Sequence, residues 1–287
     1  MNNTVQGRTG PASSVSAAAS ASAVAVLDVR RMGVSFEDGG KAKEILRDVS
    51  FRISAKEFVC IVGPSGAGKT TLVRCLAGLS RPTSGSVLLD GEPVVGPPAR
   101  LALVAQDYSR SLMPWLRVRD NVRLPLRGKG ISAAEQNARV ARALGAVGLP
   151  GAEELYPRQL SGGMQQRVSI ARALAYDPEI LIMDEPFASV DAQTRAELED
   201  LIMQLQRASQ LSVVLITHDI DESVYLSDRI LVLGGRPAGI LQEYAIDLGR
   251  TRDQLETKAL RQFAEYRSEV FRSIQAASAM MRKDDRP

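Results

Sequence analysis

Residues 58–70 read FVCIVGPSGAGKT, an apolar run that leads into a glycine-rich turn and then into a helical pattern. The five apolar residues from Phe58 to Val62 predict a strand that is buried on both faces. The turn matches the pattern GxxxxGK[ST] and is followed by a predicted helix, Thr70 to Ala77. Because a preceding strand and a following helix are the context that this phosphate-binding motif requires, the stretch predicts a nucleotide site on an α/β fold.

The glycine-rich turn supplies groups that suit a nucleotide triphosphate. It comprises Gly63, Pro64, Ser65, Gly66, Ala67, Gly68, Lys69 and Thr70, with Thr71 next in the helix. Glycines allow the backbone to wrap closely around an anion, so that successive N–H groups point at the phosphates. We expect Lys69 to reach the β- and γ-phosphates and the Thr70 hydroxyl to help to hold Mg²⁺. The alternative is a glycine-rich turn that binds nothing, and the complete set of fixed positions argues against it.

A second apolar run, Ile180 to Met183, ends in the adjacent acids Asp184 and Glu185. Charges at the end of a buried strand need partners such as a metal ion. Asp184 suits Mg²⁺, and Glu185 suits the group that activates or orients an attacking water. An acidic boundary between a strand and a surface loop is the alternative for this segment taken alone.

A third apolar run, Ser212 to Thr217, is followed by His218, the only histidine in the chain. In open α/β sheets the ligand binds at the carboxyl edge of the strands, where His218 is expected to lie. A structural histidine is the alternative. Its position after a strand favours a role in the nucleotide site.

The remaining sequence alternates predicted strands and helices, which indicates a largely parallel sheet covered by helices. We expect no strand between Leu116 and Pro157, where Ile131 to Val147 has helical spacing, and an amphipathic helix from Arg252 to about Ala277 that docks on the core. The other predicted strands are Ala25 to Arg30, Val34 to Phe36, Val49 to Ile53, Ser86 to Leu89 and Ile230 to Leu233, and the other predicted helices are Gly162 to Tyr176 and Ala192 to Arg207.

Composition limits the classes of protein to which the chain can belong. Its 287 residues are 45% hydrophobic and 24% charged, and the formal charge of +3 is too small to indicate nucleic-acid binding. No apolar stretch approaches the ~20 residues that cross a bilayer. The Ala- and Ser-rich start predicts a disordered leader rather than a signal peptide. Cys60 and Cys75 form no metal or CxxC pattern and predict core residues in a reducing compartment.

Residues 160–167 read LSGGMQQR and open a predicted helix with a second glycine-rich N-terminus, another potential anion site. This segment resembles the signature of the ATP-binding cassette (ABC) ATPases. The resemblance covers about residues 26–245 and includes, in order, the phosphate loop, Gln106, the signature, Asp184–Glu185, Asp191 and His218. It implies an α/β P-loop NTPase fold with a RecA-like core, an antiparallel β subdomain and a helical subdomain.

The same resemblance implies a domain organisation. A leader would occupy residues 1–24 and the ABC ATPase domain residues 25–245, with the helical subdomain at about 107–160. A C-terminal helical extension would occupy residues 246–287.

The resemblance also implies an ATP sandwich, in which two copies pack head to tail around two ATP molecules. Ser161 and Gly163, with Gly162 and Gln165 in the same segment, would contact the γ-phosphate held by the partner. Phe36 would stack on adenine, although a lone aromatic in a strand is more often a core residue. Gln106 would contact Mg²⁺ and couple the subdomains, Asp191 would be a nucleotide-binding residue in a loop at the cross-dimer contacts, and His218 would sense the γ-phosphate. Two departures from the family pattern, Ala105 and the loop Phe187 to Val190, remove no phosphate-contacting group.

Residues 112–115, LMPW, and residues 217–222, THDIDE, resemble the nitrate, sulfonate and taurine importer ATPases. Such a protein would hydrolyse Mg-ATP at the cytoplasmic face of the inner membrane, attached to integral membrane permease subunits and, through them, to a substrate-binding protein. No nucleic-acid partner is expected. Trp115 would be an exposed contact for a partner helix or, alternatively, a core residue.

Three functions are alternatives to that of an importer for nitrate, a sulfonate or taurine. A soluble ABC-type ATPase could act without a permease, and an importer could carry another small organic substrate. A regulator that binds nucleotide without hydrolysing it conflicts with the intact Glu185 and His218.

Overall fold

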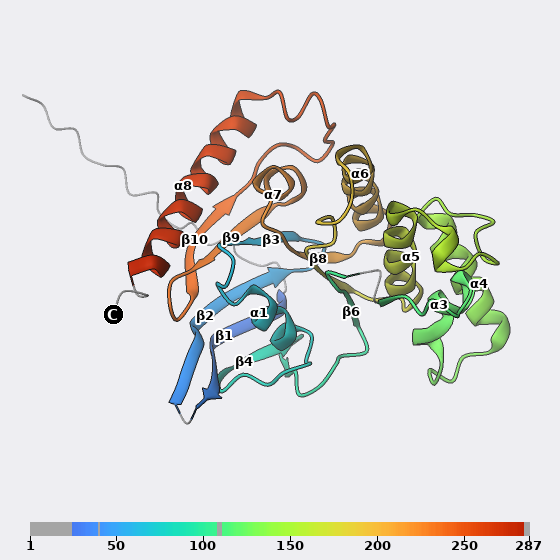
Figure 1. Cartoon of the computed structure of the whole chain (residues 1–287), viewed down its shortest axis with the longest axis horizontal. Coiled ribbons are helices and arrows are strands. Elements are labelled where there is room, and N and C mark those ends of the chain that lie inside the picture. Colours follow the sequence, from blue (N-terminus) through green and yellow to red (C-terminus); the bar gives the residue numbers. More distant parts are fainter. Residues whose placement is uncertain (1–24, 40, 108–110, 284–287) are drawn as a thin grey trace, which may run out of the picture.

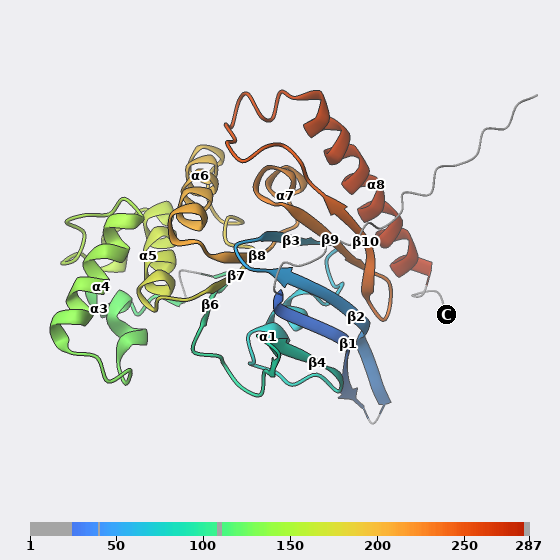
Figure 2. The ribbon, with the colours of Figure 1, turned by 180° about the vertical axis from the view of Figure 1, so that it is seen from behind.

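The computed structural model describes residues 25–39, 41–107 and 111–283, so the predicted leader lies outside the described residues. The described chain forms a six-stranded sheet, a four-stranded antiparallel sheet and a set of helices around them (Figure 1; Figure 2 from behind). Among the described residues, no helix combines the length and the apolar character that crossing a membrane requires.

The larger sheet has the strand order β10-β9-β3-β8-β7-β6. All its neighbouring strands are parallel except β10, which is antiparallel to β9. The carboxyl ends of five strands therefore meet at one edge of the sheet. Their bounds are β3 Phe58–Val62, β6 Leu101–Val104, β7 Ile180–Asp184, β8 Ser212–Ile216, β9 Arg229–Gly234 and β10 Gly239–Ala245.

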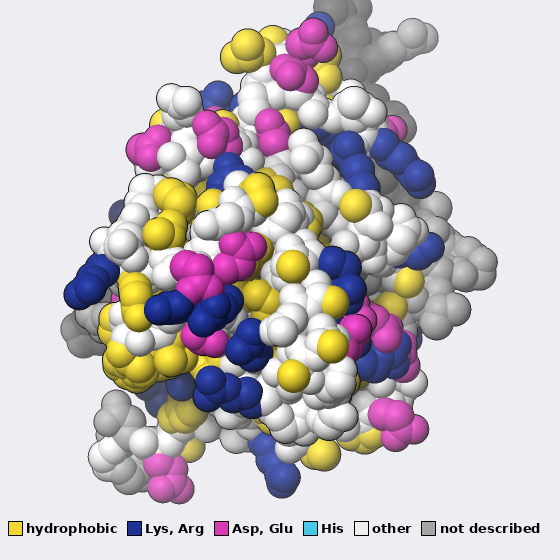
Figure 3. Space-filling view, turned by 90° about the vertical axis from the view of Figure 1, so that its right-hand side faces the viewer, with side chains coloured by type: hydrophobic (Ala, Val, Ile, Leu, Met, Phe, Trp, Pro, Cys, Tyr) yellow, Lys and Arg dark blue, Asp and Glu magenta, His cyan; other side chains and the backbone are white. Residues whose placement is uncertain are grey.

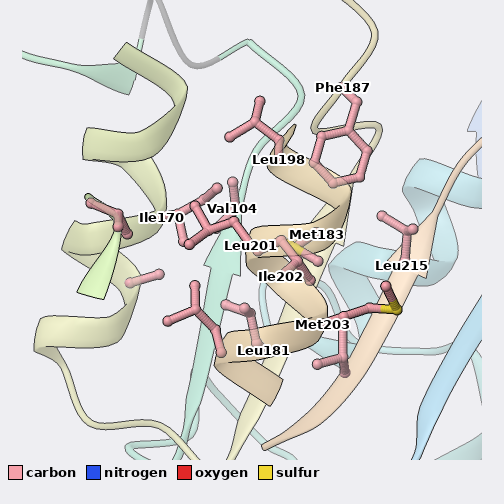
Figure 4. Packing of buried hydrophobic residues seen from close by; sticks show 14 of the residues in the cluster. Val104, Ile170, Leu181, Met183, Phe187, Leu198, Leu201, Ile202, Met203 and Leu215 are labelled. Carbon is pink, nitrogen blue, oxygen red and sulfur yellow. The ribbon is translucent and has the colours of Figure 1, made fainter. Parts of the chain in front are cut away.

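The central strands are apolar throughout because both faces of the large sheet are covered. Along β3, Phe58, Cys60 and Val62 point into one hydrophobic cluster, whereas Val59 and Ile61 point into another. The first cluster includes residues of the helices α5 (Gly162–Ala175), α6 (Ala192–Ser209) and α7 (Ile220–Leu226), and Figure 4 shows its α5–α6 part. The second includes α1 (Lys69–Leu76) and the small sheet. The predicted buried strands are thus confirmed.

The small sheet has the order β2-β1-β4-β5. The prediction of two short strands between Ala25 and Phe36 was wrong, because the chain forms one long strand there. Register shifts around Arg31, which has a left-handed backbone (φ 42°), let this strand bend without ending. The bounds are β1 Ala25–Asp38, β2 Lys41–Ser54, β4 Ser84–Leu89 and β5 Glu92–Pro93.

Helices replace strands between residues 118 and 159, as the sequence predicts. They are α3 Val118–Arg123, η1 Leu124–Leu126, α4 Ala133–Ala146 and η2 Pro157–Gln159. This part projects to one side of the large sheet (Figure 1), and on that face positive and negative side chains are interspersed with hydrophobic ones (Figure 3).

The C-terminal helix α8 spans Arg261–Lys283 and packs against β9, β10 and α7, so the predicted docking on the core is confirmed. The predicted start at Arg252 was wrong by about two and a half turns, because the helix begins at Arg261. Arg252 instead donates hydrogen bonds to carbonyls at the end of α7, and the Asp253 carboxylate accepts from the N–H groups of Leu255 and Glu256. These contacts hold residues 252–260 in turns.

Candidate nucleotide site

One edge of the large sheet brings together most of the residues that the sequence singles out. The phosphate loop follows β3, Gln106 lies two residues after the end of β6, Asp184 ends β7 and His218 lies just after β8. Because β3, β6, β7 and β8 run parallel, their carboxyl ends place these side chains on one side of the molecule.

The phosphate loop has a shape that requires glycine at specific positions. A Cβ on Gly63 would lie 2.2 Å from the backbone oxygen of Leu233, so a side chain cannot fit between the loop and β9. Gly68 has φ 84° and directly precedes α1, which starts at Lys69. The left-handed residue turns the chain so that the helix begins against the loop, with its N-terminal N–H groups available for an anion.

Lys69 is buried and its ammonium points into the phosphate loop. Its Nζ donates to the backbone oxygens of Gly63 at 2.8 Å and Pro64 at 3.2 Å. Burial lowers the pKa of Lys69, and the carboxylates of Glu185 and Asp184 oppose that shift. The ammonium is therefore already positioned and desolvated, and a phosphate oxygen would give it a stronger, charge-assisted partner.

Asp184 and Glu185 lie in different environments. Burial raises the pKa of the Asp184 carboxyl, the neighbouring Glu185 charge adds to this rise, and a hydrogen bond from Thr70 opposes it. The contact places Thr70 and Asp184, both expected near Mg²⁺, beside each other. Glu185 has a left-handed backbone with φ 45°, which is strained for a residue with a side chain and common at functional sites.

The Glu185 carboxylate lies between Gln106 and His218. Gln106 Nε2 donates to Glu185 Oε2 at 3.0 Å, and His218 Nδ1 lies 3.3 Å from the same oxygen. Residues at the ends of three strands thus form one polar cluster. Gln106 and His218 are exposed to solvent at the edge of the sheet. This geometry can orient a water molecule and contact a terminal phosphate.

Phe36 and Thr71 lie at the margins of this arrangement. Phe36 is 51% exposed on β1, so the alternative in which it fills the core is wrong. Its exposed ring is free to stack on a base. Thr71 is partly buried in the first turn of α1.

The second glycine-rich segment lies apart from the phosphate loop. Its helix, α5, packs against α3 and α4 on the far side of β6 and β7 from α1 (Figures 1 and 2). Ser161 caps α5 and accepts a hydrogen bond from the Met164 N–H at 3.3 Å, and both Ser161 and Gly162 are exposed. The structure therefore does not bring these predicted site residues together within one chain.

Gly163 and Asp191 show how tightly the signature segment and α6 are joined. A Cβ on Gly163 would lie 2.4 Å from Thr194 Cγ2. Asp191 caps α6 by accepting from the N–H and the hydroxyl of Thr194 at 3.0 Å and 2.7 Å, and these bonds lower the pKa of Asp191. The signature and the Asp191 loop therefore form one exposed surface.

The side chain of Gln165 points away from that surface. Its amide donates to the backbone oxygens of Pro157 at 3.1 Å and Leu160 at 3.3 Å. In this state it supports the turn before the signature.

Trp115 is 71% exposed, so the alternative in which it fills the core is wrong. The buried Asn121 holds the preceding turn: its oxygen accepts from the Met113 N–H at 2.7 Å, and its amide donates to the Leu116 oxygen at 3.1 Å. These bonds hold the Pro114–Trp115 pair at the surface.

Sequence reasoning missed three residues behind the site. Thr217, Glu222 and Arg195 form a buried or partly buried polar network beneath His218. The available signal was Glu222, an acid within the otherwise apolar face of a short helix that follows His218.

Comparison with known proteins places the chain among relatives of this architecture. Residues 46–188 match the ABC transporter family. An uncharacterized ABC transporter ATP-binding protein of Methanocaldococcus jannaschii is 46% identical over 244 residues, 85% of this chain and 89% of the relative.

Two relatives are named for what they import. The nitrate import ATP-binding protein NrtD of Synechocystis sp. is 45% identical over 203 residues, 71% of this chain and 76% of the relative. The aliphatic sulfonates import ATP-binding protein SsuB 1 of Xanthomonas axonopodis pv. citri is 43% identical over 235 residues, which are 80% of this chain and 92% of the relative.

A solved structure shows the same fold. It is a dimeric, post-hydrolysis state of an ATP-binding cassette bound to ADP and Pi. It is 30% identical with a TM-score of 0.67, covering 77% of this chain and 99% of the other. The shared motifs, the fold and the extent of these matches agree, and this chain belongs to the ATP-binding subunits of the ABC transporter family.

Proposed function

We propose that this chain hydrolyses Mg-ATP as the energising subunit of an importer for a small solute such as nitrate, a sulfonate or taurine. Two copies would bind two ATP molecules, each between the phosphate loop of one copy and the signature of the other. One observation carries this proposal: the chain presents two glycine-rich helix starts, and only the one at Lys69 is surrounded by the groups for hydrolysis, Glu185 and His218. The exposed start at Ser161 would bind the nucleotide held by the second copy.

Nucleotide binding follows from the phosphate loop. Its N–H groups and the Lys69 ammonium would hold the β- and γ-phosphates, and Phe36 would stack on adenine. The Thr70 hydroxyl, Asp184 and Gln106 would hold Mg²⁺, which neutralises charge on the phosphates when bound. The donors fit this ion: Thr70 and Asp184 place a hydroxyl and a carboxylate beside each other, and Mg²⁺ bound with a nucleotide takes most of its other ligands from phosphates and water.

Hydrolysis would depend on Glu185. Its carboxylate would orient a water molecule for attack on the γ-phosphorus while the bond to the β–γ bridging oxygen breaks, which yields ADP and inorganic phosphate. Gln106 and His218 hold the carboxylate in place, and the exposed His218 ring would contact the γ-phosphate. Ser161 and Gly163 of the second copy would contact it from the other side, so cleavage would release the two copies.

Transport requires permease subunits that span the membrane. The chain would attach to them at the cytoplasmic face, and a substrate-binding protein would deliver the solute. The exposed Pro114–Trp115 pair on the helical side is a suitable contact for a permease helix, because an aromatic side chain held at the surface loses little entropy on binding. The importer names of the relatives support this proposal over an ATPase that acts without a permease.

The Glu185→Gln variant tests the proposed site. It keeps the phosphate and metal contacts and removes the charge that orients water, so with Mg-ATP it should lose turnover by about a hundredfold or more and elute as a dimer in size-exclusion chromatography. Lys69→Ala, the matched control, should stay monomeric with ATP. A Glu185→Gln protein that stays monomeric and hydrolyses ATP at the normal rate would refute the assignment.

A further inference from the structure

The backbone on both sides of His218 is held by one buried hydroxyl. Thr217 is 2% exposed, and its Oγ1 donates to Glu222 Oε2 at 2.5 Å while accepting from the Asp219 N–H at 3.0 Å. His218 lies between these two fixed residues, with its side chain 61% exposed. The direction of the imidazole therefore depends on a hydrogen bond made below the sheet edge.

Arg195 connects this turn with the Asp191 loop. Its Nη1 donates to Asp219 Oδ2 at 3.0 Å, and its Nε lies 3.6 Å from Glu222 Oε1. Arg195 lies in the first turn of α6, where its N–H bonds to the backbone oxygen of Asp191 at 2.9 Å. The loop of His218 and the start of α6 are thereby joined by an ion pair rather than by apolar packing alone.

Glu222 occupies a position where an acid is unfavourable for folding. It is 4% exposed, and burial raises the pKa of its carboxyl to about 7, with further rises from Asp219 and Glu199 and opposition from the Thr217 bond and Arg195. A neutral or apolar residue facing the core at this place would avoid the cost of a buried charge. A neutral or apolar residue would therefore stabilise the fold at this position at least as well as the carboxylate does.

We propose that Thr217, Glu222 and Arg195 are positioning residues for ATP hydrolysis. They hold the His218 side chain beside the Glu185 carboxylate and connect His218 to the Asp191 loop. Thr217 and Glu222 fix the direction of the His218 ring. Arg195 transmits any movement of the Asp191 loop, which the ATP sandwich would bring against a second copy, to the residue that contacts the γ-phosphate. This inference rests on the proposed function and adds to it a route from dimer closure to the hydrolytic groups.

The test compares one substitution of Thr217 that removes the hydroxyl with one that keeps it. Thr217→Val keeps the branched shape and removes the hydrogen bonds, whereas Thr217→Ser keeps the hydroxyl. For Thr217→Val we expect kcat for ATP to fall about tenfold or more while KM changes by less than about twofold, and for Thr217→Ser both constants should stay within about twofold of wild type. Thr257→Val is the matched control: Thr257 is also buried, its Oγ1 accepts from the Asp253 N–H at 2.8 Å in the turns before α8, and the substitution should leave kcat unchanged.

Glu222→Gln supplies a readout that a purely structural role would not change. The charged and titratable groups around Glu222 are Asp219 on its own helix, Arg195 and Glu199 on α6, and Cys60 on β3; on α8, Arg267 pairs with the adjacent Asp221. If the ionised carboxylate positions His218, wild-type kcat should rise as pH increases through about 7. Glu222→Gln should keep the low rate at every pH.

The outcomes separate this inference from the proposed function. A wild-type protein with no ATP turnover would contradict the proposed function itself. With an active wild type, unchanged kcat in Thr217→Val and an unchanged pH profile in Glu222→Gln would overturn the inference. If kcat, KM and the melting temperature changed equally in Thr217→Val and Thr217→Ser, the inference would also be overturned, because the hydroxyl would then have no role beyond folding.

Discussion

The phosphate loop and the signature differ in how far each is prepared for its ligand. At the phosphate loop, Lys69 is buried and held by two carbonyls, and Glu185 is held by Gln106 and His218. At the signature, Ser161 and Gly162 are exposed, and the Ser161 hydroxyl accepts from the Met164 N–H in its own helix start. One region is organised before the nucleotide arrives, and the other presents its groups to solution.

This difference explains how nucleotide binding can control the association of two copies of the chain. Groups that are fixed in advance stabilise charge in a reaction without reorganising, which is what hydrolysis requires. Groups that are exposed and incomplete gain contacts only when a second surface brings them a phosphate, so binding and assembly become coupled. The ATP-dependent association proposed here follows from having one region of each kind in every chain.

The largest effect should come from removing the fixed cation. Lys69→Ala takes away the ammonium that faces both Asp184 and Glu185, which removes positive charge beside two neighbouring carboxylates where the phosphates would bind. We expect ATP affinity, measured by fluorescence titration with a labelled nucleotide, to fall about a hundredfold or more. Wild-type affinity in this variant would contradict the role of the phosphate loop.

Mixing two inactive variants should sharpen the comparison between the regions. Ser161→Arg should block the signature and spare the phosphate loop, and Lys69→Ala should do the reverse. If the two regions meet in trans, a mixed dimer contains one intact composite site, so the mixture should regain ATP turnover about tenfold above the sum of the separate variants. A mixture no more active than that sum would indicate that each chain completes its own site.

The prediction from sequence was strongest where chemistry and local geometry coincide. The phosphate loop, the strands at Phe58 and Ile180 and the position of His218 follow from apolar runs that end in polar groups, and each lies where the pattern placed it. Such segments need little tertiary information, because burial on both faces forces the strand and the sheet edge forces the site.

Elements that depend on distant partners could not be predicted. The strand at Leu101 is only four residues long and is defined by pairing with β7, and the helix at Ile220 has only seven residues. The helix α8 begins late because Arg252 bonds to the end of α7, a contact between segments far apart in the sequence. The exposure of Phe36 and Trp115 likewise depends on the assembled surface.

A smaller effect should appear in the stability of the folded protein. The pKa of Glu222 rises from the ordinary 4.5 to about 7 in the folded protein, so the folded state binds the proton more tightly than the unfolded state. Relative to Glu222→Gln, wild-type stability should therefore fall as pH rises from about 4.5 to about 7, by an amount on the order of 3 kcal/mol. Urea unfolding of both proteins across this range measures the difference, and parallel stability profiles would contradict it.

The smallest effect on the isolated protein should come from Trp115, which lies at the surface just before α3. Trp115→Ala removes a side chain that is mostly exposed, so unfolding stability should change by less than about 0.5 kcal/mol and basal ATP turnover should not change. In cells that contain the permease, solute uptake should fall sharply. Normal uptake would show that Trp115 is not a docking residue.

A crystal structure of the protein with Mg²⁺ and a slowly hydrolysed ATP analogue tests the central claim most directly. We predict that the Ser161 hydroxyl of one copy lies about 3 Å from a γ-phosphoryl oxygen bound at Lys69 of the other copy. A bound analogue with both Ser161 side chains far from every terminal phosphoryl group would contradict the account.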